Sequence, residues 1–238
     1  MSEPLAEQFD TTKHFDASRS SAYDDKIRRV VPGYDAMHEM AHFLLRAHVA
    51  EHAKVLVVGA GTGKESITYA LANPSWAITG IDPTEHMLSI AVQRAAHHQL
   101  AGRVNLHLGT LQTLESSLPF DAATSILVMQ FLPDDGAKEN FLREIAARLK
   151  SKARLVLVDL EGTKASPEFN EFIAVWEAHQ LATRADRADV EKDFEHIVRD
   201  IQFVPQSRIE ELLHRAGFGN VRKFYSAFLF GGYVAERQ

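Results

Sequence analysis

The sequence contains no cysteine, so it has no disulfide bond, no thiolate metal ligand and no cysteine nucleophile. It has no apolar run long enough to cross a membrane, and its first residues do not join a basic region to an apolar stretch. Basic residues are in the minority, 26 against 32 acidic ones. This balance disfavours a nucleic-acid or anionic-membrane partner without excluding a nucleic acid. We therefore expect a soluble, cytoplasmic protein without membrane contact.

What the sequence does contain suits one folded unit. Of its 238 residues, 45% are hydrophobic, which is enough for a substantial core. This length predicts one α/β domain, or one such domain with a small added lid.

The most informative stretch begins with an apolar run at residues 55–58, which is typical of a buried parallel strand. Gly59, Gly61 and Gly63 follow, and a helical pattern begins near Lys64. Glycines at this spacing predict a tight turn that lets backbone N–H groups approach a ligand closely.

Three kinds of nucleotide site compete for this turn. A phosphate-binding P-loop would need glycine in place of Val58 and a hydroxyl in place of Glu65. A dinucleotide site would need glycine where Lys64 stands. The third pattern, G-x-G-x-G with an acid closing the next strand, is met by Asp82. Its carboxylate can accept both hydroxyls of a ribose, and a ligand without pyrophosphate, such as S-adenosylmethionine, suits this pattern.

Residues 55–82, followed by 83–88, resemble the cofactor-binding half of class I S-adenosylmethionine-dependent methyltransferases. The likeness covers roughly residues 50–160 by motif and the whole chain by element order. It implies a doubly wound, mostly parallel seven-stranded sheet of the Rossmann-like methyltransferase type, with N-terminal helices and a helical lid inserted after the fifth strand. The cofactor would be S-adenosylmethionine and its product S-adenosylhomocysteine.

Four segments are expected on this basis. They are an N-terminal arm with covering helices (1–52), a cofactor-binding α/β core (53–161), a helical lid (162–205), and a final helix with a β-hairpin that completes the sheet (206–238). The fourth and fifth strands are expected at 122–129 and 155–158. Two apolar stripes in the lid would cover the acceptor pocket or form a homodimer surface, and these alternatives are compatible.

The resemblance also implies which residues bind the cofactor. Val-Pro-Gly-Tyr, ending at Tyr34, resembles an element of carboxy-S-adenosylmethionine synthases in which the tyrosine touches the methionine end of the cofactor. Packing at a helix start is the alternative for Tyr34, and a core position is the alternative for Met87. Thr110 stands where many methyltransferases have an aspartate for the adenine amino group. The full expected set is Tyr34, Gly59, Ala60, Gly61, Gly63, Asp82, Pro83, Met87, Thr110, Leu111 and Val128.

No catalytic residue is identified by the sequence. Methyl transfer depends mainly on positioning and desolvation, and a hydroxyl acceptor would add the need for a general base. Weak candidates are Glu161, His86, His179 and Tyr23, and the expected lid adds His196.

A metal site is not predicted. His38 and His42 lie one helical turn apart, but zinc would need a third ligand and none follows. A histidine-rich surface helix is the favoured interpretation.

Three functions remain open. The first is methyl transfer to a small, partly apolar acceptor. The second is a tRNA-nucleotide or cofactor-modifying enzyme of the carboxy-S-adenosylmethionine synthase type. Such synthases bind an extra carboxylate through an arginine and carry an asparagine on the fourth strand, whereas Phe194 and Ile126 stand at these positions here. The third is a protein that binds the cofactor without catalysis.

Overall fold

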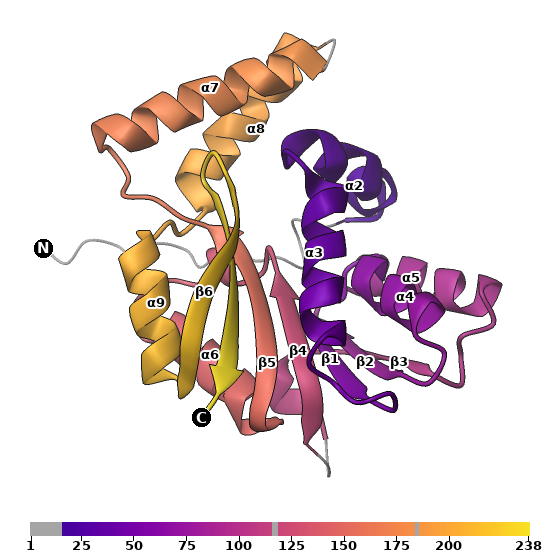
Figure 1. Cartoon of the computed structure of the whole chain (residues 1–238). Coiled ribbons are helices and arrows are strands. Elements are labelled where there is room, and N and C mark those ends of the chain that lie inside the picture. The colour runs from indigo at the N-terminus through magenta and orange to yellow at the C-terminus, as the bar shows by residue number, and fades with distance from the viewer. Residues whose placement is uncertain (1–15, 116–118, 184–185) are drawn as a thin grey trace, which may run out of the picture.

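A computed structural model describes residues 16–115, 119–183 and 186–238. Residues 1–15 of the expected N-terminal arm lie outside this description. Seven strands form a single sheet in the order β3-β2-β1-β4-β5-β7-β6 (Figure 1). Five neighbouring strands are parallel, and β7 runs antiparallel to both β5 and β6. The expected doubly wound, mostly parallel fold is confirmed.

The seven strands range from 5 to 12 residues in length. Their bounds are β1 (Lys54–Val58), β2 (Ala77–Asp82), β3 (Val104–Leu108), β4 (Phe120–Ile126), β5 (Leu149–Leu160), β6 (Phe218–Ala227) and β7 (Phe230–Arg237). In β1, Val55, Leu56 and Val57 are fully buried, as a central parallel strand requires.

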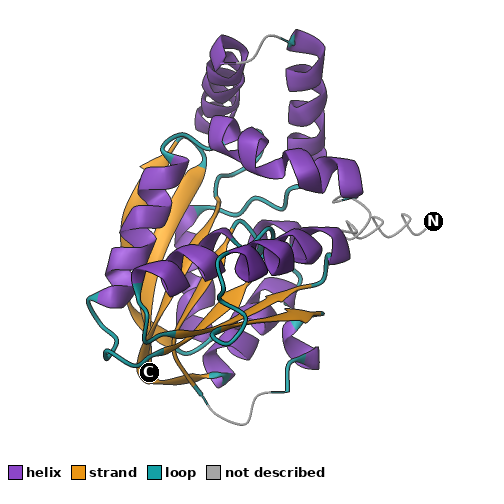
Figure 2. Ribbon diagram, turned by 90° about the vertical axis from the view of Figure 1, so that its right-hand side faces the viewer, coloured by secondary structure: helices purple, strands orange, loops and turns teal. Residues whose placement is uncertain are grey.

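Helices cover both faces of the sheet (Figure 2). On one face lie α3 (Tyr34–Arg46), α4 (Lys64–Ala72) and α5 (Glu85–His97), and on the other lie α6 (Ala137–Ala147) and α9 (Gln206–Arg215). Gly217, with φ +89°, follows the end of α9 and fits the left-handed position after a helix. Two separate apolar clusters result, one on each side of the sheet.

Two strand ends differ from the sequence expectation. Strand β4 stops at Ile126 and not at residue 129, because Leu127 takes a left-handed conformation with φ +60°. A 3-10 turn, η2 (Met129–Phe131), follows immediately. Strand β5 begins at Leu149, earlier than expected, because Leu149 pairs with Phe120 of β4. It also extends to Leu160, where it pairs with Phe230 of β7. The first difference matters for function, since it places a turn where a strand was expected.

Three helices stand beyond the carboxyl ends of the strands: α2 (Ala17–Val30), α7 (Pro167–Thr183) and α8 (Arg187–Asp200) (Figure 1). Trp176 of α7 is buried and donates from Nε1 to the carbonyl oxygen of Val30 at 2.7 Å. Lys26 of α2 pairs with Asp193 of α8 at 2.6 Å. These contacts join the helical segment after β5 to the N-terminal helices, while the four-segment division stays a prediction. Across the described ranges, no helix combines the length and apolarity needed to span a membrane.

Candidate cofactor and acceptor site

The glycine turn has the conformation that its spacing predicts. Gly59, Gly61 and Gly63 have φ of +76°, +51° and +88°, a region that side chains rarely adopt. The backbone N–H of Gly59 donates to the carbonyl oxygen of Ile81 at 2.9 Å, which fixes the turn against β2. Helix α4 begins directly afterwards at Lys64.

The three glycines serve different purposes. A Cβ on Gly59 would lie 2.2 Å from Cγ2 of Val128, and one on Gly63 would lie 3.0 Å from Cβ of Ala91. Gly61 is less crowded, since its nearest side-chain neighbour would be Cε of Met87 at 3.5 Å. The outer two glycines therefore permit close packing, and the middle one keeps backbone accessible to a ligand.

Asp82, at the end of β2, points at this turn. One carboxylate oxygen accepts from the Gly61 N–H and the other from the Thr84 N–H, each at 2.8 Å. The side chain is buried, and burial raises the pKa of its carboxyl group. The Thr84 side chain is a further hydrogen-bond partner of this carboxylate. The two oxygens together have about four acceptor sites, so the carboxylate keeps capacity for a ligand hydroxyl beside the open glycine.

The other expected cofactor residues lie around the same sheet edge. Tyr34 is buried with its ring 4.4 Å from that of His38, and Val128 packs on Gly59. Ala60, Met87 and Leu111 are buried, whereas Pro83 and Thr110 are exposed. The Thr110 N–H donates to Oγ1 of Thr113 at 3.2 Å, so this backbone group already has a partner.

Helix α2 is tied to the glycine turn. Oγ1 of Thr62 donates to Asp24 at 2.7 Å, and Arg94 of α5 pairs with the same carboxylate at 2.5 Å. Tyr23 lies near Glu65, Asp24 and Asp82, and burial, followed by these carboxylates, raises the pKa of its phenol. Helix α2 thus covers the turn, as a water-excluding cover would.

Glu65 was missed as a site residue. It occupies the first turn of α4, is buried, and has a pKa raised to about 7 by burial. In the sequence, Glu65 is simply a charged residue two positions after Gly63. That position fits a solvated first turn of a helix as well as it fits a buried site.

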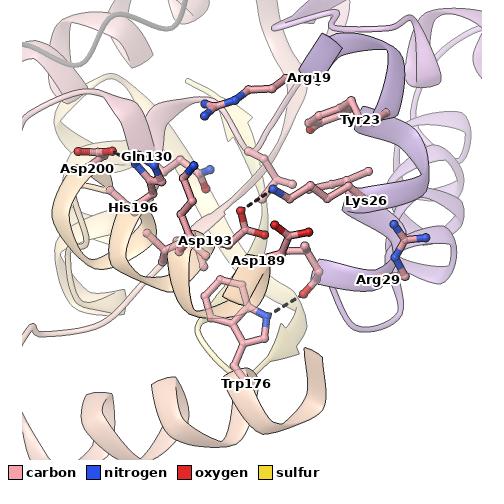
Figure 3. A pocket seen from close by; sticks show the side chains of 18 of the residues that line it. Arg19, Tyr23, Lys26, Arg29, Gln130, Trp176, Asp189, Asp193, His196 and Asp200 are labelled. Atoms are coloured by element: carbon pink, nitrogen blue, oxygen red, sulfur yellow. Dashed lines mark hydrogen bonds and ion pairs between the residues drawn. The ribbon is translucent and has the colours of Figure 1, made fainter. Parts of the chain in front are cut away.

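A cavity of about 700 Å³ opens between α2 and α8 (Figure 3). Its floor comes from the ends of β4 and β5 through Leu127, Gln130, Phe131 and Leu160. The cavity lies beside the turn, and the glycines themselves do not line it. Its remaining walls come from α2, α7, α8 and β7, through Arg19, Ala22, Tyr23, Asp25, Lys26, Ile27, Arg29, Val30, Trp176, Asp189, Lys192, Asp193, His196, Ile197, Asp200, Ile201 and Phe230.

Of the four candidate bases, Tyr23 lines this cavity. Glu161 forms an ion pair with Lys223 and accepts from the Tyr233 hydroxyl, which uses its carboxylate structurally. His86 is exposed at the start of α5, and the His179 ring lies against Phe228 at 5.8 Å.

His196 also lines the cavity. Its Nδ1 lies 3.2 Å from Asp200 and 2.5 Å from Arg199. It comes from the segment that the sequence placed in a lid.

The expected histidine-rich surface on α3 is wrong for His38 and His42. Both are buried, because this face of the helix packs against the sheet and its aromatic neighbours. The His42 ring stacks on Tyr69 at 5.2 Å and its Nε2 contacts the Asn73 amide at 2.8 Å. Burial lowers the pKa of His38 to about 3, so this residue is a neutral core histidine. Among the described residues, no group of three or more histidine and carboxylate side chains is arranged to hold a metal ion.

The positions that differ from carboxy-S-adenosylmethionine synthases are structural here. Phe194 is buried, with its ring 5.0 Å from that of Trp176. Ile126 is buried at the end of β4. Arg199 forms an ion pair with Asp200, with 2.6 Å between Nε and Oδ1.

The fold and the glycine–carboxylate site together define a methyltransferase of the Rossmann-like class. The methyltransferase-domain family matches residues 50–217. The chain therefore belongs to this family, as a class I S-adenosylmethionine-dependent methyltransferase with S-adenosylmethionine as its cofactor.

The alignments with proteins of similar sequence span most of this chain. A carboxy-S-adenosyl-L-methionine synthase of Campylobacter fetus subsp. fetus is 25% identical, over 98% of this chain and 96% of its own. A demethylmenaquinone methyltransferase of Lactiplantibacillus plantarum is 28% identical, over 87% of this chain and 91% of its own. Among solved structures, the 1,6-didemethyltoxoflavin-N1-methyltransferase of Burkholderia thailandensis has a TM-score of 0.63 and 19% identity, over 100% of this chain and 93% of its own. This structural likeness shows the fold.

Proposed function

We propose that the protein transfers a methyl group to a small, partly apolar acceptor bound in the cavity between α2 and α8. The observation that carries this proposal is the position of the cavity. Its floor is the turn after β4, and Val128 of that turn packs on Gly59 of the cofactor turn. An acceptor in the cavity would therefore lie next to the cofactor, as an in-line displacement needs.

Several residues of this chain fit the cofactor. Asp82 would accept the ribose hydroxyls, and the open side of Gly61 would admit the ligand to the backbone. Met87 would contact the adenosine, and Tyr34 the methionine end. When bound, S-adenosylmethionine supplies an electrophilic methyl group. The residues of the chain bind, orient and exclude water.

The charge of the cavity suits a neutral acceptor. Four basic side chains (Arg19, Lys26, Arg29 and Lys192) and four acidic ones (Asp25, Asp189, Asp193 and Asp200) line it. This balance gives no net field for a polyanion such as RNA. The remaining wall is mainly aliphatic and aromatic, which supports an acceptor with an apolar ring or chain.

For a hydroxyl acceptor, we propose that Nε2 of His196 takes the proton, in the tautomer whose Nδ1–H donates to Asp200 and not the one whose Nδ1 accepts from Arg199. The raised pKa of Tyr23 keeps that phenol protonated at neutral pH, so it would donate a hydrogen bond and would not act as a base. The helices α2 and α8, joined by Lys26 and Asp193, would close over the reactants.

A second candidate is a cofactor-modifying enzyme of the carboxy-S-adenosylmethionine synthase type. The near full-length match to such synthases favours it. The buried Phe194 and Ile126 count against it, because neither side chain can bind an extra carboxylate.

Calorimetric titration with S-adenosylmethionine and S-adenosylhomocysteine tests the common premise, and we expect both to bind. The protein is then incubated with methyl-deuterated S-adenosylmethionine and a metabolite extract, with Asp82→Ala as the inactive control. A deuterated small molecule that only the wild type forms supports methyl transfer. A modified cofactor without a methylated product supports the second candidate. Absence of binding to either compound by folded protein refutes both.

A further inference from the structure

The cavity floor carries one amide side chain, that of Gln130, whose oxygen has no partner in the part of the chain that the structure describes. Gln130 lies on the turn η2 and lines the cavity, yet only 7% of the residue is exposed. Its side-chain oxygen is buried and has no hydrogen-bond partner among the described residues. A buried amide oxygen in this state is costly, so it points to a ligand group that completes it.

Hydrogen bonds fix the backbone of the turn around Gln130. Its carbonyl oxygen accepts from the Gln202 N–H at 2.8 Å, and its N–H donates to the buried carboxylate of Asp159. The neighbouring Met129 carbonyl accepts from Nζ of the fully buried Lys138 at 2.8 Å. These bonds fix the backbone of the turn. Rotation about the soft terminal torsion of the side chain presents the oxygen to the cavity without moving the backbone.

The other floor residues are apolar. Leu127, Phe131 and Leu160 line the floor with Gln130, and Phe230 lines the same cavity. Figure 3 shows Gln130 beside His196 and Asp200 of α8, so polar side chains border one side of the amide. A ligand on this floor would meet apolar side chains with a single neutral amide among them. Such a site discriminates by one hydrogen bond and not by charge.

We propose that Gln130 is the residue that selects the acceptor. Its Oε1 accepts a hydrogen bond from an N–H or O–H group on a small, uncharged ring compound. This inference rests on the proposed function, since it takes the cavity as the acceptor site. It narrows the acceptor class to ring compounds with such a donor, and it excludes fully alkylated rings.

Two probe pairs test the proposal in protein saturated with S-adenosylhomocysteine. Indole is compared with 1-methylindole, and 2-naphthol with 2-methoxynaphthalene, by ligand-observed NMR titration. Each pair shares its ring and differs by the donor. We expect the donor-bearing member to bind the wild type about tenfold more tightly or better, the range for a buried polar group that loses its partner. In Gln130→Met, the ratio should fall to about one.

Gln180→Met is the matched control. Gln180 is a fully buried amide on α7, its side chain also lacks a partner among the described residues, and it does not line the cavity. This variant should keep the wild-type ratio.

Three outcomes overturn the inference: equal binding of both members to the wild type, no binding of any probe, or a preference that survives in Gln130→Met. S-adenosylhomocysteine binding is measured first. If the wild type does not bind S-adenosylhomocysteine, the proposed function is refuted as well. If it binds S-adenosylhomocysteine but shows no preference for the donor-bearing probes, this inference alone is refuted.

Discussion

Replacement of Asp82 by alanine should affect cofactor affinity and stability together. The carboxylate accepts from two backbone N–H groups at 2.8 Å each, the half-buried one of Gly61 and the buried one of Thr84. A fully buried N–H that loses its acceptor costs about 1–3 kcal/mol, so we expect the free energy of unfolding to fall by up to about 6 kcal/mol. The lost ribose contact should weaken S-adenosylhomocysteine binding by a further factor of roughly 5 to 150, which corresponds to about 1–3 kcal/mol.

The assay pairs urea denaturation with calorimetric titration of S-adenosylhomocysteine. Asp121→Ala is the matched control, because Asp121 also accepts from a backbone N–H, that of Lys54, at 2.8 Å. This contact lies at the start of β1, and Gly61 follows the end of the same strand. Asp121→Ala should lose stability and keep its cofactor affinity.

Asp82→Asn tests the same contact with a smaller structural change. It keeps one acceptor oxygen but turns an NH₂ group toward the second N–H, so it should also weaken binding. Unchanged affinity in folded Asp82→Ala would refute the placement of the ribose at Asp82.

Two further substitutions probe the turn and its buried acid. Gly59→Ala should destabilise the protein by about 2–4 kcal/mol, because the new Cβ would lie 2.2 Å from Val128 and a φ of +76° is strained for alanine. In the control Gly136→Ala, the new Cβ would have no atom within 4 Å, so only the backbone strain of about 1–2 kcal/mol remains. Equal losses of unfolding free energy in the two variants, measured by urea denaturation, would contradict this prediction. Glu65 has a folded pKa of about 7 against a reference of 4.5, so folded protein holds a proton that the unfolded chain releases, and wild-type stability should rise as pH falls from about 7 to 4.5. Glu65→Gln should remove up to about 3 kcal/mol of this rise between pH 7.5 and pH 4.5, and an unchanged difference between the two pH values would refute it.

Local patterns in the sequence determined the cofactor half. The apolar run at β1, the three glycines and Asp82 lie close together along the chain or at the ends of adjacent strands, so periodicity and spacing were enough to place them. The same holds for the ends of α4 and α9, where Asn73 and Gly217 act through local backbone geometry.

The resemblance implied a helical lid, but tertiary structure decided which residues line the proposed acceptor cavity. The cavity joins α2 to α8 and to the turn after β4, segments far apart along the chain, and no local pattern encodes their meeting. Burial likewise separated His38 and His42, which became core residues, from His196, which lines the cavity. The unpaired side-chain oxygen of Gln130 is also a tertiary property, because an amide is left without a partner only by the residues that pack around it. Spacing reports contacts within a strand or helix, whereas burial and pairing depend on every element that packs around a side chain.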